Sequence, residues 1–204
     1  MTTSLFYYHC EEVDGGEDII TKDVLPAIIA KIYGFDGSLV GFHRIYLDEV
    51  SGSKAKVPEA KMLISPLYKD GYSTQGCVVP LAKAGEVIGI CEGIETALAI
   101  NEMGHPCWSL IDAYKLPNFN PPKGVKVINA FGDLDKSYTG QNQLIKLFDN
   151  LREKRPEIQV NLHLPPSNYW DKAKNPKGID FLDAYLMGYR LPNDLVLRNK
   201  ESIC

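Results

Sequence analysis

The sequence lacks the features that mark several common classes of protein. Its 204 residues contain no apolar run approaching the length of a membrane-spanning helix, so an integral membrane protein is not expected. The N-terminus has no basic segment followed by an apolar core, which argues against secretion. The five cysteines are scattered without a CxxC pair, which argues against a structural zinc site and fits a reducing cytoplasm. They are Cys10, Cys77, Cys91, Cys107 and Cys204.

The chain is also short of positive charge. Its net charge of −4 argues against a protein that coats nucleic acid nonspecifically, since such binding depends on many contacts from Lys and Arg to phosphates. Positive charge is nevertheless concentrated locally, ahead of residue 70. Within that segment Arg44, Lys54 and Lys61 are candidates to contact the phosphates of a nucleotide or a template, and ordinary solvated charge is the alternative.

A hydrophobic content of 45% supports a real core, and the length suits one domain with a smaller companion. Residues 1–23 show no clear periodicity and are interpreted as an irregular arm. Residues 25–33 and 39–47 read as two strands joined by a turn at 35–38, which predicts a hairpin. Two further short strands are expected, separated by a loop at 65–76. They are residues 61–64 and 77–81.

From about residue 86 the pattern changes to strands that alternate with helices. Such alternation predicts βαβ units and a mainly parallel sheet with right-handed crossovers. A last helix is expected in the segment 175–185, after a Pro/Gly turn. The predicted strands lie near 87–91, 106–111, 125–131 and 158–164, and the predicted helices near 95–103 and 140–154.

Acidic residues follow two of these strands. Glu92 closes the run 87–91, and Asp133 and Asp135 come directly after the run 125–131. Ligands bind outside the carboxyl ends of the strands of an open parallel sheet, so the three carboxylates are expected to converge there. Carboxylates held together repel one another unless a cation lies between them, and oxygen ligands favour Mg²⁺ or Mn²⁺.

The residues around these acids resemble the Toprim domain, the catalytic module of bacterial-type primases, type IA and type II topoisomerases and some nucleases. The resemblance rests on CEGIETALAINEMGHPCWSLIDA and on VKVINAFGDLDKSYTGQNQLIKLFDNL, in which Glu92 matches the Toprim glutamate and Asp133 and Asp135 match its DxD aspartates. Upstream, PAIIAKIYGFDGSLVGFHRIYLD and KAKVPEAKMLIS are similar to the segment that precedes Toprim in phage and mobile-element primases. The resemblance covers roughly residues 5 to 185.

The resemblance implies an α/β fold. It consists of a Toprim-like, Rossmannoid, mainly parallel sheet flanked by helices at 85–190, a smaller β-rich subdomain at 1–84, and a C-terminal tail at 191–204.

The implied catalytic and metal-binding residues are Glu92, Asp133 and Asp135, with Glu92 either a ligand or the general acid/base. Asp180 and Asp183 stand where many Toprim proteins carry a further acidic motif, and they complete a second metal site or cap a helix. Each of the first three has a plainer alternative, which is the end of a strand for Glu92 and an exposed turn for the aspartates. Gly93 permits a sharp turn or the close approach of a phosphate, as Gly132 does. Lys136 is a candidate substrate contact at the start of the next helix.

The first functional hypothesis is a primase-type nucleotidyltransferase that acts on single-stranded DNA and nucleoside triphosphates with Mg²⁺ or Mn²⁺, with a helicase or another replication protein as a further partner. The chain shows neither the zinc-binding nor the helicase module that such primases carry, so a compact relative, a piece of a larger protein or a redeployed Toprim protein all fit. A metal-dependent nuclease is the second hypothesis. The third is a non-catalytic phage or mobile-element protein that binds a replication or defence partner. A cytoplasmic location is expected.

Overall fold

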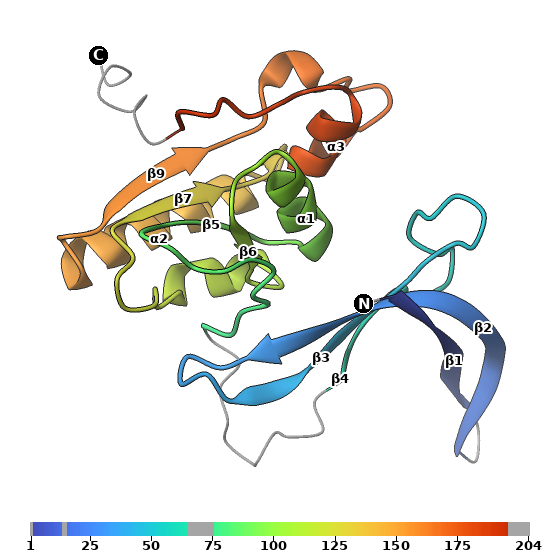
Figure 1. The fold of residues 1–204 in the computed structure, drawn as a ribbon. Helices are drawn as coiled ribbons and strands as arrows, with labels where there is room; N and C mark the ends of the chain where they lie inside the picture. The colour runs from blue at the N-terminus through green and yellow to red at the C-terminus, as the bar shows by residue number, and fades with distance from the viewer. Residues whose placement is uncertain (1, 14–15, 65–75, 196–204) are drawn as a thin grey trace. The chain divides into compact units, whose positions relative to one another are not determined.

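The computed structural model describes residues 2–13, 16–64 and 76–195 (Figure 1). The chain divides into two compact units, of which the first contains most residues up to Tyr72 and the second contains residues from Ser73 onward. Residues 73–84, which the sequence assigns to the N-terminal subdomain, therefore group with the second unit. In the described ranges, no helix has both the length and the apolar character needed to cross a lipid bilayer.

The first unit is an antiparallel sheet of four consecutive strands in the order β1-β2-β3-β4. The predicted hairpin is confirmed, since β2 ends at Tyr33 and pairs with β3 from Leu39 onward. The irregular arm expected at residues 1–23 is wrong, because β1 pairs along its whole length with β2, from Gly16 to Ile28. The strands are β1 (Thr2–Val13), β2 (Gly16–Tyr33), β3 (Leu39–Tyr46) and β4 (Lys61–Ile64). Most of the loop expected at 65–76 lies outside the described residues.

The core of this sheet is small. Ala27 and Tyr46 are fully buried, and Ala55 packs with them. The guanidinium group of Arg44 lies over the ring of Tyr46, with Cζ 5.6 Å from the ring centroid, and its Nη1 donates to the tyrosine hydroxyl at 3.0 Å. The Arg44 side chain is therefore positioned by Tyr46, two residues further along the same strand.

The second unit contains a parallel sheet in the order β6-β5-β7-β9, which confirms the predicted α/β class. Its strands are β5 (Val87–Cys91), β6 (Cys107–Ser109), β7 (Val127–Phe131) and β9 (Gln159–His163). The two long helices are α1 (Ile94–Glu102) and α2 (Thr139–Lys154). The expected strand at 77–81 is wrong, since Val78 and Val79 form only isolated bridges there, with Val79 paired to Ser109 of β6.

The direction of the connections places the helices. The chain runs from β5 through α1 to β6 on one side, whereas it runs from β7 through α2 to β9 on the other. Because parallel crossovers are right-handed, opposite directions put the two helices on opposite faces of the sheet. Figure 1 shows α1 in front of the sheet and α2 behind it.

Five short elements complete the described part of this unit, and four of them had no counterpart in the sequence prediction. These four are the 3₁₀ helices η1 (Ala113–Asn118) and η2 (Ser167–Tyr169) and the strands β8 (Leu134–Asp135) and β10 (Gly178–Ile179), which pair as a two-stranded antiparallel ribbon. The fifth is the expected last helix, α3 (Phe181–Leu186), which packs against α1. Leu191 and Leu195 are buried in the core beside α1, so the first part of the expected tail belongs to the folded unit.

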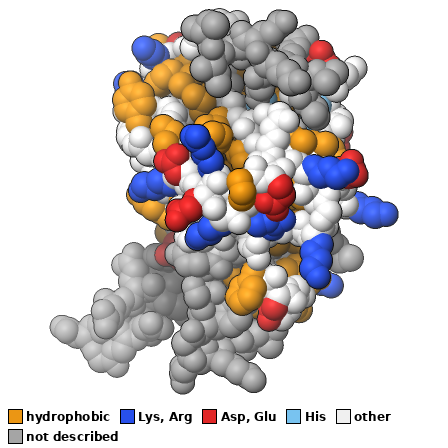
Figure 2. Space-filling model, turned by 90° about the vertical axis from the view of Figure 1, so that its left-hand side faces the viewer, with side chains coloured by type: hydrophobic (Ala, Val, Ile, Leu, Met, Phe, Trp, Pro, Cys, Tyr) orange, Lys and Arg blue, Asp and Glu red, His pale blue; other side chains and the backbone are white. Residues whose placement is uncertain are grey.

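Figure 2 shows one face of the molecule, on which Lys and Arg side chains alternate with Asp and Glu. Two ion pairs of the second unit illustrate such mixing, Lys126 with Glu86 at 2.6 Å and Arg155 with Glu157 at 2.5 Å. Interspersed charges of both signs are typical of a solvated surface and create no single-sign field.

Candidate active site

The predicted acidic residues meet at the point where the sheet changes direction. β5 and β7 are adjacent, and Cys91, the last residue of one, pairs with Phe131, the last residue of the other. Their onward connections leave toward opposite faces of the sheet, so a crevice forms between the two strand ends, which is where open α/β sheets bind ligands. Glu92 directly follows β5, and Asp133 follows β7 by two residues.

The backbone at Glu92 is fixed by a buried serine. Ser109, at the end of β6, is fully buried, and its hydroxyl donates to the carbonyl oxygen of Glu92 at 2.7 Å. The same hydroxyl accepts the backbone N–H of Ile111 at 3.1 Å. Ile111 has a φ of +76°, which is strained for a β-branched residue, so the turn that follows β6 is held in an unfavourable backbone conformation. Sequence reasoning did not single out either residue.

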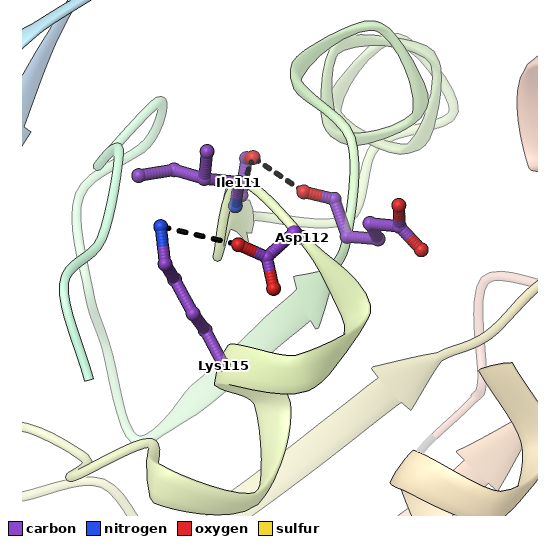
Figure 3. Close-up of polar contacts among 5 residues, drawn as sticks. Ile111, Asp112 and Lys115 are labelled. Atoms are coloured by element: carbon purple, nitrogen blue, oxygen red, sulfur yellow. Dashed lines mark hydrogen bonds and ion pairs between the residues drawn. The ribbon is translucent and has the colours of Figure 1, made fainter. Parts of the chain in front are cut away.

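Next to this turn lies a buried lysine. Lys115 of η1 is only 6% exposed, and its ammonium pairs with the Asp112 carboxylate at 3.2 Å (Figure 3). A buried charge needs such a partner because the interior solvates it poorly. The ion pair joins the residue before η1 to η1 itself, in the segment that follows β6.

The two glycines beside the acids differ from expectation. Gly93 has φ −87° and ψ 150°, a conformation open to any residue, so no sharp turn requires it. At Gly132 an added Cβ would lie 2.5 Å from Cδ1 of Leu144, so the small residue lets α2 pack against the strand end. The close approach of a phosphate to Gly93 stays a prediction.

Asp135 caps the start of α2. Its Oδ1 accepts the hydroxyl of Ser137 at 2.6 Å, and its Oδ2 accepts the backbone N–H of Gly140 at 3.3 Å. Partial burial raises the pKa of Asp135, but hydrogen bonds from Ser137 and from the backbone of Gly140 and Thr139 outweigh it, so the pKa is lowered overall. Asp135 is thus a stable carboxylate, and it occupies N–H groups that a phosphate would otherwise use.

Asp133 has the opposite character. Burial raises the pKa of Asp133 to about 7, and the negative charges of Glu92, Asp180, Asp135 and Asp183 contribute, in that order. Among those charges, Glu92 has the largest effect. Acids from three separate segments therefore all act on the pKa of Asp133, and their joint role in one metal site stays a prediction.

Asp180 and Asp183 form a capping box at the start of α3. Asp180 Oδ1 accepts the backbone N–H of Asp183 at 2.9 Å, and Asp183 Oδ2 accepts that of Asp180 at 3.1 Å. The capping alternative from the sequence is therefore realised. Burial, followed by the charge of Asp180, raises the pKa of Asp183 against the lowering effect of their backbone hydrogen bond.

A pocket of about 220 Å³ lies between the DxD aspartates and the aspartates of the α3 capping box. The β8–β10 ribbon brings the loop before α3 against the DxD segment, with Gly178 opposite Asp135. An added Cβ on Gly178 would lie 2.5 Å from the Leu134 carbonyl oxygen, so glycine is required for this contact. The lining residues are Asp133, Asp135, Lys177, Gly178, Ile179, Asp180 and Asp183.

The donor set fits a hard divalent cation. The pocket is lined by carboxylates, and burial, followed by the charges of Glu92 and the other acids, raises the pKa of Asp133, so that a proton or a cation stabilises this side chain. Within the described ranges, the side chains as they stand form no group of three or more His, Cys, Asp or Glu at metal-binding distances. A cation therefore requires the carboxylate side chains to turn toward it.

The predicted basic contacts are divided between the two units. Arg44, Lys54 and Lys61 belong to the first, and Lys136 is exposed directly after Asp135 in the second. Their contacts with phosphates stay predictions.

Comparison with known families agrees with this geometry. Residues 87–185 match the family model of the Toprim domain. The second unit carries a Toprim domain. Residues 5–73 match the model of a domain of unknown function (DUF7146). No curated protein sequence matches the chain significantly.

Solved structures of primases share the fold. A DNA primase domain from Pseudomonas aeruginosa has a TM-score of 0.51 at 13% identity, over 87% of this chain and 51% of that one. The primase fragment of the bacteriophage T7 primase-helicase protein has a TM-score of 0.50 at 15% identity, over 89% of this chain and 63% of that one. The RNA polymerase domain of Mycobacterium tuberculosis primase DnaG, in complex with double-stranded DNA, has a TM-score of 0.47 at 16% identity, over 93% of this chain and 57% of that one.

The chain thus spans between half and two thirds of the length of these structures. At such identities the likeness shows the fold alone, which resembles that of primase cores, while the Toprim assignment rests on the family match of residues 87–185.

Proposed function

We propose that this Toprim domain is the catalytic core of a Mg²⁺-dependent nucleotidyltransferase of the primase type, which joins ribonucleotides on single-stranded DNA. The observation that supports the proposal is the pocket lined by Asp133, Asp135, Asp180 and Asp183 beside the carboxyl end of β7, where burial and then Glu92 raise the pKa of Asp133 to about 7. Carboxylates kept together at such a cost, at the switch point of a parallel sheet, are typical of a functional site.

The residues that would hold the cation are Asp133 and Asp135, with Glu92 either as a third ligand or as the general acid/base, and with Asp180 and Asp183 as candidates for a second ion. A bound Mg²⁺ or Mn²⁺ supplies charge neutralisation on the reacting phosphate and on the attacking hydroxyl. Asp135 contributes a permanent negative charge, because its hydrogen bonds from Ser137 and from the start of α2 keep its pKa low. Asp133 would be held as a carboxylate by a bound cation, whose charge would offset the burial and the neighbouring acids that raise its pKa.

Glu92 is the candidate general acid/base. The hydrogen bond from Ser109 fixes the backbone of Glu92, so its carboxylate extends from a fixed position at the end of β5. In this role Glu92 takes the proton from the attacking 3′ hydroxyl, or returns one to the leaving group. Lys136 in the Toprim domain would provide positive charge for a substrate phosphate. Arg44, Lys54 and Lys61, which belong to the first unit, are separate candidates for contacts with the phosphates of a nucleotide or a template.

The test is primer synthesis from labelled nucleoside triphosphates on a single-stranded template with Mg²⁺ or Mn²⁺. We expect products from the wild-type chain, a loss of about a hundredfold or more in Glu92→Gln, and no products from Asp133→Ala. Asp149→Asn is the matched control, since Asp149 is an exposed carboxylate on α2 that does not line the pocket. Absence of primers from the wild-type chain contradicts the proposal.

The same reactions separate the alternatives. Metal-dependent nicking of plasmid or single strands without primer formation would indicate a nuclease. A captured replication or defence protein whose binding survives both Glu92→Ala and Asp135→Ala would indicate a non-catalytic role. Crystals soaked in Mn²⁺ provide a direct check, because anomalous density either lies among the carboxylates or does not.

A further inference from the structure

One basic side chain lines the acidic pocket. Lys177 shares the lining with four carboxylates, those of Asp133, Asp135, Asp180 and Asp183. A pocket of carboxylates repels phosphate groups unless cations intervene. A lysine on its rim therefore changes which ligands the pocket can accept.

The backbone of Lys177 is fixed in this place. Its carbonyl oxygen accepts the N–H of Lys136 at 3.0 Å, and the next residue, Gly178, pairs with Asp135 in the ribbon. Ile179 is buried and anchors the other end of the ribbon. The loop thus holds the Cα of Lys177 beside the DxD segment while leaving its side chain exposed.

The ammonium group of Lys177 is not used by the fold. Within the described part of the chain it makes no ion pair, although four carboxylates line the same pocket. Lys174, three residues earlier in the same loop, behaves differently, since it lies 3.7 Å from the Asp171 carboxylate. Lys177 therefore keeps its hydrogen-bond donors for a ligand.

We propose that Lys177 binds the phosphate chain of a nucleoside triphosphate at this site. The inference rests on the proposed function and names a specificity determinant for it. The pocket volume of about 220 Å³ suits phosphate groups and cations, and it is smaller than the roughly 300 Å³ or more of pockets that enclose a whole drug-sized ligand. A terminal phosphate chain carries more charge per phosphate than a DNA backbone does, so it gains more from a compact, strongly charged ammonium.

The test compares Lys177→Gln with Lys174→Gln in the full chain. ATP binding in the presence of Mg²⁺ is measured by calorimetry, and Mn²⁺ binding without nucleotide by electron paramagnetic resonance. We expect Lys177→Gln to weaken ATP binding about tenfold, as the loss of one charge-assisted hydrogen bond does. Its Mn²⁺ affinity should stay unchanged or rise, because a repelling cation is removed. Lys174→Gln should match the wild type in both measurements, and Lys177→Arg should recover part of the ATP affinity.

Three outcomes would overturn the inference. Equal ATP affinity in Lys177→Gln and in the wild type is the first. A joint loss of Mn²⁺ and ATP binding is the second, because it indicates a structural role for the side chain. Weaker binding of a single-stranded oligonucleotide with unchanged ATP binding is the third, because it assigns Lys177 to the DNA backbone. A wild-type chain that binds neither Mn²⁺ nor ATP removes the proposed function itself, and so is distinct from these three.

Discussion

The hydroxyl of Thr96 donates a hydrogen bond to Asp180 Oδ2 at 2.8 Å, across 84 residues of sequence. Thr96 lies in α1, directly after the Glu92 turn, and Asp180 is the N-cap of α3. The other oxygen of the same carboxylate accepts the backbone N–H of Asp183. One side chain therefore ties the first acidic segment to the last, and it fixes the start of α3 at the same time.

Thr96→Val tests this tie. The substitution keeps the shape of a side chain that is only 4% exposed but removes its donor. We expect the free energy of unfolding to fall by about 1 to 2 kcal/mol, because the half-buried Asp180 oxygen loses a partner. Urea denaturation measures the change. Thr96→Ser keeps the hydroxyl and should be closer to the wild type, and equal losses in the two variants would contradict the role of the hydrogen bond.

Gly178→Ala should break the pairing between β8 and β10. The new Cβ would meet the Leu134 carbonyl oxygen at 2.5 Å and the Asp135 Cα at 2.7 Å, both in the backbone and unable to move independently. We expect a loss of about 2 kcal/mol or more in stability, together with weaker Mn²⁺ binding because the pocket wall shifts. Gly124→Ala is the control, since Gly124 also has a positive φ, +89°, but its Cβ would meet nothing within 4 Å. Similar effects of the two changes would show that backbone strain, and not the ribbon, is responsible.

The pH dependence of stability should report the environment of Asp133. Its pKa in the folded, metal-free protein is raised from 3.8 to about 7, first by burial and then by Glu92. Between pH 4 and 7 the folded protein therefore holds a proton that the unfolded chain has lost, so this group makes stability fall as the pH rises through that window.

Asp133→Asn removes this penalty. We expect the variant to gain up to about 4 kcal/mol over the wild type at pH 8 in metal-free buffer, and to differ little at pH 4. Urea denaturation at both pH values, with a chelator present, measures the difference. A gain that is the same at both pH values would show that Asp133 does not titrate in this range. Added Mg²⁺ should stabilise the wild type more than the variant.

Ser109→Ala should act on catalysis through Glu92. The change leaves the Ile111 N–H and the Glu92 carbonyl oxygen without their shared partner, at a cost of about 1 to 3 kcal/mol in stability. We also expect slower primer synthesis with an unchanged KM for nucleotide, because the general acid/base is displaced and not the binding pocket. Ser167→Ala, at an exposed serine in η2, is the control. A rise in KM with an unchanged rate would assign Ser109 to substrate binding instead.

The sequence was sufficient for the parts of the fold that have a local signal. The runs that became β5 and β7 are short and apolar and are followed by acids. Helix α2 begins one residue before its predicted start at 140 and ends at its predicted end, 154. Strand-helix alternation then determined the parallel sheet, and the sheet brought Glu92 toward Asp133.

What the sequence did not reveal lacks such a signal. The β8–β10 ribbon pairs two residues with two others more than forty positions away, and no periodicity can arise in elements that short. Ile111 adopts a left-handed conformation that its residue type disfavours, so propensity pointed away from it. β1 was missed because its aromatics and the acids near its end show no alternation, although a long antiparallel partner stabilises it as a strand.

The ribbon has a practical consequence for anyone who shortens this chain. A cut after β9, where the alternating pattern ends, would keep a complete parallel sheet yet delete one wall of the pocket with Lys177, Asp180 and Asp183. It would also expose the core that Leu191 and Leu195 cover. A piece that retains both the pocket and this part of the core therefore extends at least to Leu195, well beyond the last strand of the sheet.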